Sequence, residues 1–117
     1  MRSKEVEMKL AVIGSRKINC LELSEIIPGD VDEIVSGGAD GIDRLAEEFA
    51  KSRGIKFTVF LPEYDKYGRA APIVRNKKIV EYADEVYSFW NGNSKGTKFV
   101  IDYCKKINKK CRIIMID

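Results

Sequence analysis

Five short apolar runs divide the chain, and segments with helical spacing lie between them. The runs are residues 8–13, 33–36, 56–61, 85–90 and 111–116, and several are continuous rather than alternating. Continuous runs rich in Val, Ile, Phe and Tyr are typical of strands that are buried on both faces of a sheet. The pattern therefore predicts five strands in a parallel sheet.

Apolar side chains between the runs recur every three and four residues, which predicts four helices. Each expected helix is defined by one set of apolar residues. The four sets are Leu21, Leu23, Ile26 and Ile27; Ile42, Leu45, Ala46, Phe49 and Ala50; Ile73, Val74, Ile79 and Tyr82; and Phe99, Val100, Tyr103, Cys104 and Ile107. Pro28 and Gly29 end the first helix, Gly54 is a C-cap of the second, and Pro72 is tolerated near the start of the third.

Alternating strands and helices predict an α/β fold with right-handed crossovers, which is a doubly wound, Rossmann-like parallel sheet with helices on both faces. We expect the strand order 3-2-1-4-5, although the order 2-1-3-4-5 is also common. The length of 117 residues predicts one domain, residues 1–117. No apolar run approaches the ~20 residues that span a bilayer, and residues 1–14 are too polar for a signal peptide. We therefore expect a cytoplasmic protein without membrane contact.

Histidine is absent and cysteine is sparse, which limits the metal sites and catalytic nucleophiles that the chain can form. Cys20, Cys104 and Cys111 are widely spaced, with no CxxC motif, so we expect reduced, partly buried thiols and no metal site. Nucleophiles activated by histidine are also excluded. A catalytic proton would have to be carried by a carboxylate, a lysine, a tyrosine or water.

The net charge of +3 is unevenly distributed along the chain. Residues 1–63 hold 9 basic and 12 acidic side chains, whereas residues 64–117 hold 12 basic and 6 acidic ones. A basic half favours an anionic ligand or a nucleic acid. The alternative is a solvated helix face, because Lys98, Lys105, Lys106, Lys109 and Lys110 belong mostly to the end of the last predicted helix, where the dipole favours cations.

Polar, glycine-rich segments follow four of the five apolar runs. They are Gly14-Ser15-Arg16, then residues 37–43, 62–69 and 91–97. In open α/β sheets, ligands bind outside the carboxyl ends of the strands, near the point where the strand order reverses. The four segments therefore predict one shared pocket at that edge.

Each segment offers groups suited to a phosphate-bearing ligand. Gly14 allows close backbone approach, while Ser15 and Arg16 can contact an anion. Glycines before the second helix place amide groups at a helix N-terminus, where phosphate binds. Asp40 is either the N-cap of that helix or a pocket residue, and Asp43 either complements the helix dipole or holds a ribose hydroxyl.

Later segments add a second phosphate cradle and aromatic rings. Ser94-Lys95-Gly96-Thr97 precedes the fourth helix, and Arg75 and Asn76 make a polar turn in an otherwise apolar helix. Tyr64, Tyr67 and Trp90 either stack on a base or belong to the core. Neither GxxxxGK[ST] nor GxGxxG is present, so the chain is neither a P-loop NTPase nor an ordinary dinucleotide-binding domain.

Together these motifs resemble those of the YspA-like family of the SLOG superfamily, whose relatives include the LOG cytokinin-activating enzymes and the DprA Rossmann domain. The matching segments are residues 14–16, 36–43, 62–76 and 89–97, with one departure at Ala71, where glycine is expected. The resemblance implies a Rossmann-like domain that binds a nucleotide or nucleotide-derived ligand, often as a sensor. It is also compatible with a homo-oligomer.

The LOG enzymes hydrolyse the N-glycosidic bond of a nucleoside monophosphate with a glutamate on the helix after a Gly-Thr pair. Gly96 and Thr97 align with that pair, and the glutamate position falls on Val100, which cannot handle a proton. Asp102 lies about 200° further round the helix and is no simple replacement. Glu63 and Asp43 remain as catalytic candidates for another hydrolytic chemistry.

Three functions therefore compete: a nucleotide sensor, a nucleotide glycosidase or other hydrolase, and single-stranded nucleic-acid binding. The third is least favoured because the chain has no basic stripe interleaved with aromatic residues. No cofactor besides the nucleotide ligand is expected. The expected ligand-binding residues are Gly14, Ser15, Arg16, Ser36, Gly37, Gly38, Ala39, Asp40, Asp43, Glu63, Tyr67, Arg75, Asn76, Trp90, Ser94, Lys95, Gly96 and Thr97.

Overall fold

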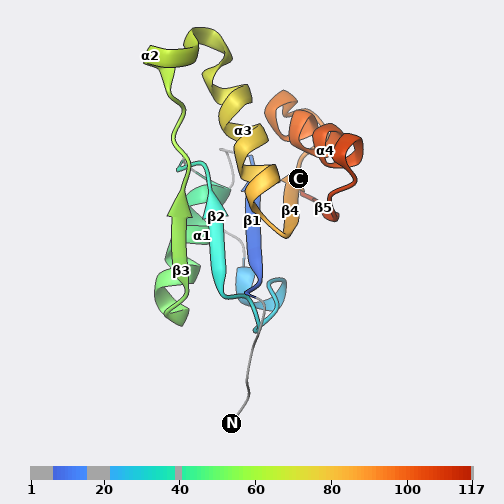
Figure 1. Cartoon of the computed structure of the whole chain (residues 1–117). Coiled ribbons are helices and arrows are strands. Elements are labelled where there is room, and N and C mark those ends of the chain that lie inside the picture. The colour runs from blue at the N-terminus through green and yellow to red at the C-terminus, as the bar shows by residue number, and fades with distance from the viewer. Residues whose placement is uncertain (1–6, 16–21, 39–40, 117) are drawn as a thin grey trace.

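A parallel sheet of five strands, in the order β3-β2-β1-β4-β5, forms the centre of the computed structural model, which describes residues 7–15, 22–38 and 41–116 (Figure 1). The strands are β1 (Lys9–Gly14), β2 (Glu33–Ser36), β3 (Lys56–Val59), β4 (Glu85–Trp90) and β5 (Cys111–Met115). All four neighbouring pairs are parallel. The predicted fold class and strand order are confirmed.

Strand bounds agree closely with the apolar runs. β2 and β4 have the predicted bounds, and β1 lies one residue later than expected. β3 ends two residues early, at Val59, although the Phe60 amide still donates to the Ser36 carbonyl over 2.9 Å. Pro62 has no amide hydrogen and cannot extend the ladder, so the chain leaves the sheet here.

The helical segments are η1 (Leu23–Glu25), α1 (Ile42–Arg53), α2 (Tyr64–Tyr67), η2 (Gly68–Ala70), α3 (Ala71–Tyr82) and α4 (Lys95–Ile107). The predicted second, third and fourth helices are therefore confirmed. The predicted first helix is wrong within the described residues, where only the single 3-10 turn η1 forms before Pro28. The short turns α2 and η2 were not predicted, because so few residues carry no periodic pattern.

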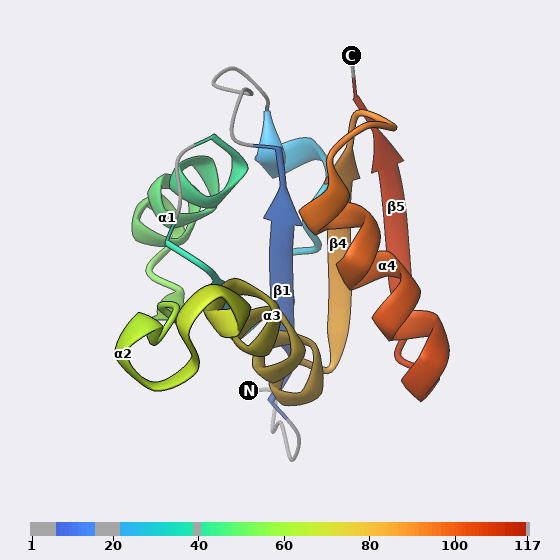
Figure 2. The same cartoon turned by 90° about the horizontal axis from the view of Figure 1, so that it is seen from above.

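Two separate apolar cores cover the two faces of the sheet. Leu10 and Val12 of β1 belong to the core under η1 and α1, whereas Ala11 and Ile13 belong to the core under α3 and α4. Figure 2 shows α3 and α4 together on one side of the strands, with α1 placed apart from them. The alternation follows from the two-residue period of a strand, and it makes the sheet doubly wound.

The ends of α1 show how its bounds are set. Gly54 has φ 66°, and its amide donates to the carbonyls of Ala50 and Lys51, so it is the predicted C-cap. The N-cap is Gly41, with φ 73° and no side-chain capping bond, rather than Asp40, which lies outside the described residues. A positive φ at this position favours glycine over aspartate.

The lysine-rich outer face of α4 follows from its amphipathic pattern. Val100, Ile101 and Cys104 are buried, whereas Lys98 is exposed and pairs with Asp102 over 2.8 Å. Lys105 and Lys106 lie in the last turn, where the helix dipole favours cations. No helix in the described part of the chain is long and apolar enough to cross a membrane.

Candidate functional site

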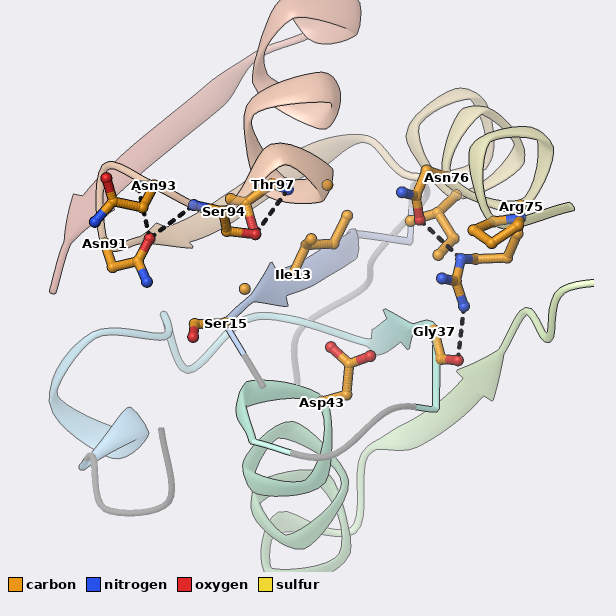
Figure 3. A pocket seen from close by; sticks show the side chains of 14 residues that line it. Ile13, Ser15, Gly37, Asp43, Arg75, Asn76, Asn91, Asn93, Ser94 and Thr97 are labelled. Carbon is orange, nitrogen blue, oxygen red and sulfur yellow. Dashed lines mark hydrogen bonds between the residues drawn. The ribbon is translucent and has the colours of Figure 1, made fainter. Parts of the chain in front are cut away.

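A cavity of about 500 Å³ lies at the carboxyl ends of β1 and β4, the neighbouring strands between which the strand order reverses (Figure 3). This is where open α/β sheets bind ligands, and the volume is that of a small-molecule site. The cavity is lined by Ile13, Gly14, Ser15, Gly37, Asp43, Pro72, Arg75, Asn76, Ile79, Asn91, Asn93, Ser94, Gly96 and Thr97.

Gly14 and Ser15 form the floor of the cavity by bringing β1 against β4 and α1. A Cβ atom on Gly14 would lie 2.7 Å from the Phe89 carbonyl oxygen and 2.9 Å from Cγ1 of Ile42. The Ser15 amide donates to the Phe89 carbonyl over 3.3 Å, and the Ile42 amide donates to the Ser15 carbonyl over 3.2 Å. Gly14 therefore allows neighbouring elements of the chain to approach, in addition to any role toward a ligand. Arg16 lies outside the described residues.

The start of α4 forms one wall, and side chains hold it in place. Asn91 Oδ1 accepts from the amides of Asn93, over 2.8 Å, and Ser94, over 2.9 Å. Ser94 is the N-cap, and its Oγ accepts from the Thr97 amide over 3.4 Å. The first amides of a helix have no partner within the helix and attract anions. Gly96 lies in this turn with open space beside its Cα, so a ligand can approach the backbone.

Arg75 of α3 forms the opposite wall and is anchored to the loop that follows β2. Its Nη1 donates to the Gly37 carbonyl over 3.0 Å, and its Nε donates to Asn76 Oδ1 over 2.7 Å. Gly37 also lies against Asp43, since a Cβ atom on Gly37 would be 3.3 Å from Oδ2 of that residue. Asp43 is 8% exposed and points from the first turn of α1 into the cavity (Figure 3). A cation and a carboxylate from different helices therefore meet beside Gly37.

Glu63 and Tyr67 do not line this cavity, which corrects the expectation of one pocket for all of the segments. They line a second hollow of about 320 Å³ on the other side of α3, with Lys78 and Val74. Glu63 accepts from Lys78 Nζ over 2.9 Å, and this hydrogen bond, together with the lysine charge, lowers the pKa of the Glu63 carboxyl. The helix separates the two hollows because residues 72, 76 and 79 face one of them and residues 71, 74 and 78 face the other. Arg75 borders both.

Other predicted site residues lie beside the cavity without lining it. Trp90 donates from Nε1 to the Ser94 carbonyl over 3.0 Å and so holds the start of α4 in place. Lys95 is exposed. Ser36 is fully buried, and Gly38 has φ 75° and packs near Val59 and Leu61. Ala39 and Asp40 lie outside the described residues. Tyr64 is 58% exposed, so it belongs neither to the core nor to the cavity.

Asn91, Asn93, Pro72 and two apolar residues, Ile13 and Ile79, line the cavity but were missed as site residues. The two asparagines occur in the polar segment after β4, and that segment was the available signal. Ile13 and Ile79 also belong to the core under α3 and α4, and nothing in an apolar pattern separates a core residue from a cavity floor.

The acidic chemistry of the cavity is limited to one carboxylate among the described lining residues, that of Asp43. Val100 is fully buried in the core under α3 and α4, and Asp102 pairs with Lys98 on the outer face of the helix. No cluster of metal-ligating side chains occurs among the described residues. No family model, curated protein or solved structure matches the chain.

Proposed function

We propose that this chain binds a nucleotide, or a nucleotide-derived ligand, by its phosphate and acts as a sensor of that ligand. One observation carries the proposal: the first turn of α4 and the guanidinium of Arg75 lie on opposite walls of the same cavity (Figure 3). A helix N-terminus carries a partial positive charge, and arginine forms strong, charge-assisted bonds to phosphate oxygens. A phosphate between the two walls would be stabilised from both sides.

The remaining lining favours a nucleotide over a free phosphate ion. The Asp43 carboxylate is suited to accept hydrogen bonds from ribose hydroxyls, as acidic residues do in other α/β nucleotide sites. Side-chain amides of Asn76, Asn91 and Asn93 offer both donors and acceptors. Ile13 and Ile79 give the cavity an apolar surface on which a base can rest. The resemblance to YspA-like proteins of the SLOG superfamily supports the same class of ligand.

Hydrolysis of the bound nucleotide is the second candidate, and Asp43 is the observation in its favour. Glycosidases ordinarily use two carboxyl groups that flank the scissile bond. Here Glu63 lies in the other hollow and is paired with Lys78. Binding without chemistry therefore fits the described lining better. Chromatography of AMP incubated with the protein would reveal free base or ribose phosphate if hydrolysis occurs. If that product also disappears in Asp43→Asn, the protein is a hydrolase and the sensor proposal is wrong.

Titration calorimetry with AMP, ADP-ribose and inorganic phosphate tests the binding proposal. We expect the wild type to bind a nucleotide, and Arg75→Ala to bind it about ten- to a hundredfold more weakly, since hydrogen bonds to charged groups contribute ~1.5–3 kcal/mol. Arg69→Ala is the matched control, because Arg69 is exposed on η2 and does not line the cavity.

Two results would contradict the proposal. One is the absence of heat and of a thermal shift with every nucleotide at millimolar concentration. The other is equal affinity of wild type and Arg75→Ala. A single-stranded oligonucleotide belongs in the same series, because binding to it alone, with a steep dependence on salt, would identify a nucleic-acid partner instead.

A further inference from the structure

Two cysteines outside the cavity lining belong to the same core region, which the sequence pattern does not indicate. Cys104 is on α4 and is fully buried, while Cys111 is the first residue of β5 and packs against the core cluster that contains Cys104. The Cys104 carbonyl accepts from the Lys109 amide over 2.8 Å, so the chain turns from the end of α4 straight into β5 and keeps both cysteines on the same face of the sheet. The Ser88 hydroxyl of β4 lies 3.7 Å from Cys111 Sγ. Neither cysteine is in a disulfide.

The two thiols differ in accessibility. Cys111 is half-buried and lies on β5, at the end of the strand order, whereas Cys104 is 0% exposed. A reagent from solvent therefore meets Cys111 first. Cys104 is closed to solvent in the folded protein.

The surroundings also separate the two thiols chemically. A hydrogen bond from the Cys104 thiol lowers the pKa of Cys111 to about 7, helped by the Ser88 hydroxyl and the charge of Lys105, against burial and the charge of Glu85. The same hydrogen bond and burial raise the pKa of Cys104, against the charge of Lys109. Cys111 therefore ionises at a lower pH than Cys104, and the thiolate is the form that reacts.

We propose that Cys111 is a thiol-modification site for low-molecular-weight disulfides and that Cys104 is its resolving partner. The Cys111 thiolate attacks one sulfur of glutathione disulfide, which forms a mixed disulfide and releases one glutathione thiolate. Cys104 then loses its proton to water and attacks Cys111 Sγ, which forms the Cys104–Cys111 disulfide and releases the second glutathione thiolate. Two protein thiols are oxidised, and the reagent is reduced to two thiols.

The second step follows from the first by electrostatics. A mixed disulfide at Cys111 has no negative charge, so it removes the hydrogen bond to a thiolate that raises the pKa of Cys104. The positive charge of Lys109 then favours the Cys104 thiolate. Modification of Cys111 thus activates its neighbour.

Neither cysteine lines the cavity, so this inference does not depend on the proposed ligand. Cys104 is seven residues after Thr97, the last residue of α4 that lines the cavity, which is roughly 10 Å along the helix axis. We expect the disulfide to leave nucleotide affinity unchanged.

Mass spectrometry of the folded full chain after treatment with glutathione disulfide tests the inference. Acid quenching and cleavage before aspartate give one peptide, residues 102–116, that contains both cysteines and excludes Cys20. In the wild type we expect this peptide to become lighter by two hydrogen atoms. In Cys104→Ala it should instead remain heavier by one glutathione moiety, and in Cys111→Ala it should stay unmodified.

The alkylation rate of Cys111 by iodoacetamide is the second measurement, and it should rise with pH around a midpoint near 7. An unmodified wild-type peptide, or a mixed disulfide that persists in the wild type, would overturn the inference. Modification of Cys104 in Cys111→Ala would overturn the assigned order. Circular dichroism of each variant verifies that it is folded. If Cys104→Ala is unfolded, Cys104→Ser takes its place in the same measurement.

Discussion

At the scale of single residues, the absence of a side chain on Gly37 leaves room for Arg75 at the edge of the cavity. A Cβ atom on Gly37 would lie 2.6 Å from Nη1 of Arg75. The Gly37 carbonyl also accepts a hydrogen bond from that nitrogen over 3.0 Å. The sequence predicted Gly37 as part of a phosphate-binding loop. In the structure its carbonyl binds the guanidinium of Arg75.

Gly37→Ala tests this role. The added methyl group would displace the guanidinium, which is the far end of a flexible side chain, so we expect a change of at most about 1 kcal/mol in the free energy of unfolding. Nucleotide affinity should fall at least about threefold, because Arg75 loses its anchor and its orientation. Calorimetry and urea denaturation measure the two effects. Gly29→Ala, with open space beside Gly29, is the control, and unchanged affinity in Gly37→Ala would contradict the role.

At the scale of elements, α4 links stability to the proposed binding site through its first turn. Ser94 caps the helix, and Asn91 holds the loop that leads into it. The same turn forms a wall of the cavity. Because one set of groups orders the helix start and shapes the wall, a change in the cap should affect both properties.

Ser94→Ala should lower the free energy of unfolding by about 1 kcal/mol, the usual cost of losing an N-cap side chain. It should also weaken nucleotide binding, because the first turn of α4 becomes less ordered. Chemical denaturation and calorimetry provide the two measurements. Ser52→Ala removes a hydroxyl from α1 that bonds only the Phe49 carbonyl within the described structure, so its affinity should match the wild type. Equal stability of Ser94→Ala and wild type would show that the cap is dispensable.

Element prediction succeeded where periodicity was long and failed where it was short. α1 and α4 each have several buried residues at helical spacing, and a glycine or an asparagine in the left-handed region ends them. The described segment before Pro28, residues 22–27, has the same apolar character but forms only η1, and Pro28 cannot continue a helix beyond it.

At the scale of the whole molecule, the two edges of the sheet differ. The carboxyl edge holds the cavity, whereas the amino edge contains a buried carboxylate. Glu33 of β2 is 2% exposed and accepts from Thr58 Oγ1 over 2.6 Å and from the Tyr82 hydroxyl over 2.7 Å. Lys56 Nζ lies 3.7 Å from its other oxygen. Glu33 therefore connects β2, β3 and the end of α3.

Burial acts to raise the pKa of Glu33, but the hydrogen bonds from Thr58 and Tyr82 and the charges of Lys56 and Lys9 outweigh it and lower the pKa. A carboxyl whose pKa is lowered by folding stabilises the protein above its unfolded pKa, roughly 4.3 for glutamate, and loses this effect as pH falls through the folded pKa. The ionised form of Glu33 therefore contributes stability at neutral pH.

Glu33→Gln should reduce the free energy of unfolding by about 1–3 kcal/mol at pH 7, and the difference from wild type should shrink as pH falls below about 4. Urea denaturation over a pH series measures it. Lys56→Ala, which removes a lysine side chain that is 69% exposed, should cost less than about 1 kcal/mol. Nucleotide affinity should be unchanged in both variants. A difference that is constant from pH 7 to pH 3 would contradict the role of the charge.

The sequence by itself determined the α/β class, the order of the main elements and the edge of the sheet at which polar segments gather. These depend on local chemistry: strand and helix periods, glycine at C-caps, and the direction of parallel strands. Gly14, Ser15, Gly37, Asp43, Asn76 and the turn from Ser94 to Thr97 accordingly meet in one cavity.

Only the tertiary structure decided which side chains share a space. α3 places Asn76 in the cavity and Glu63 and Tyr67 in another hollow, and it sets Arg75 between them. α4 and β5 bring Cys104 to Cys111. These relations depend on the rotation of each helix against the sheet, which packing of distant residues sets and which no spacing along the chain encodes.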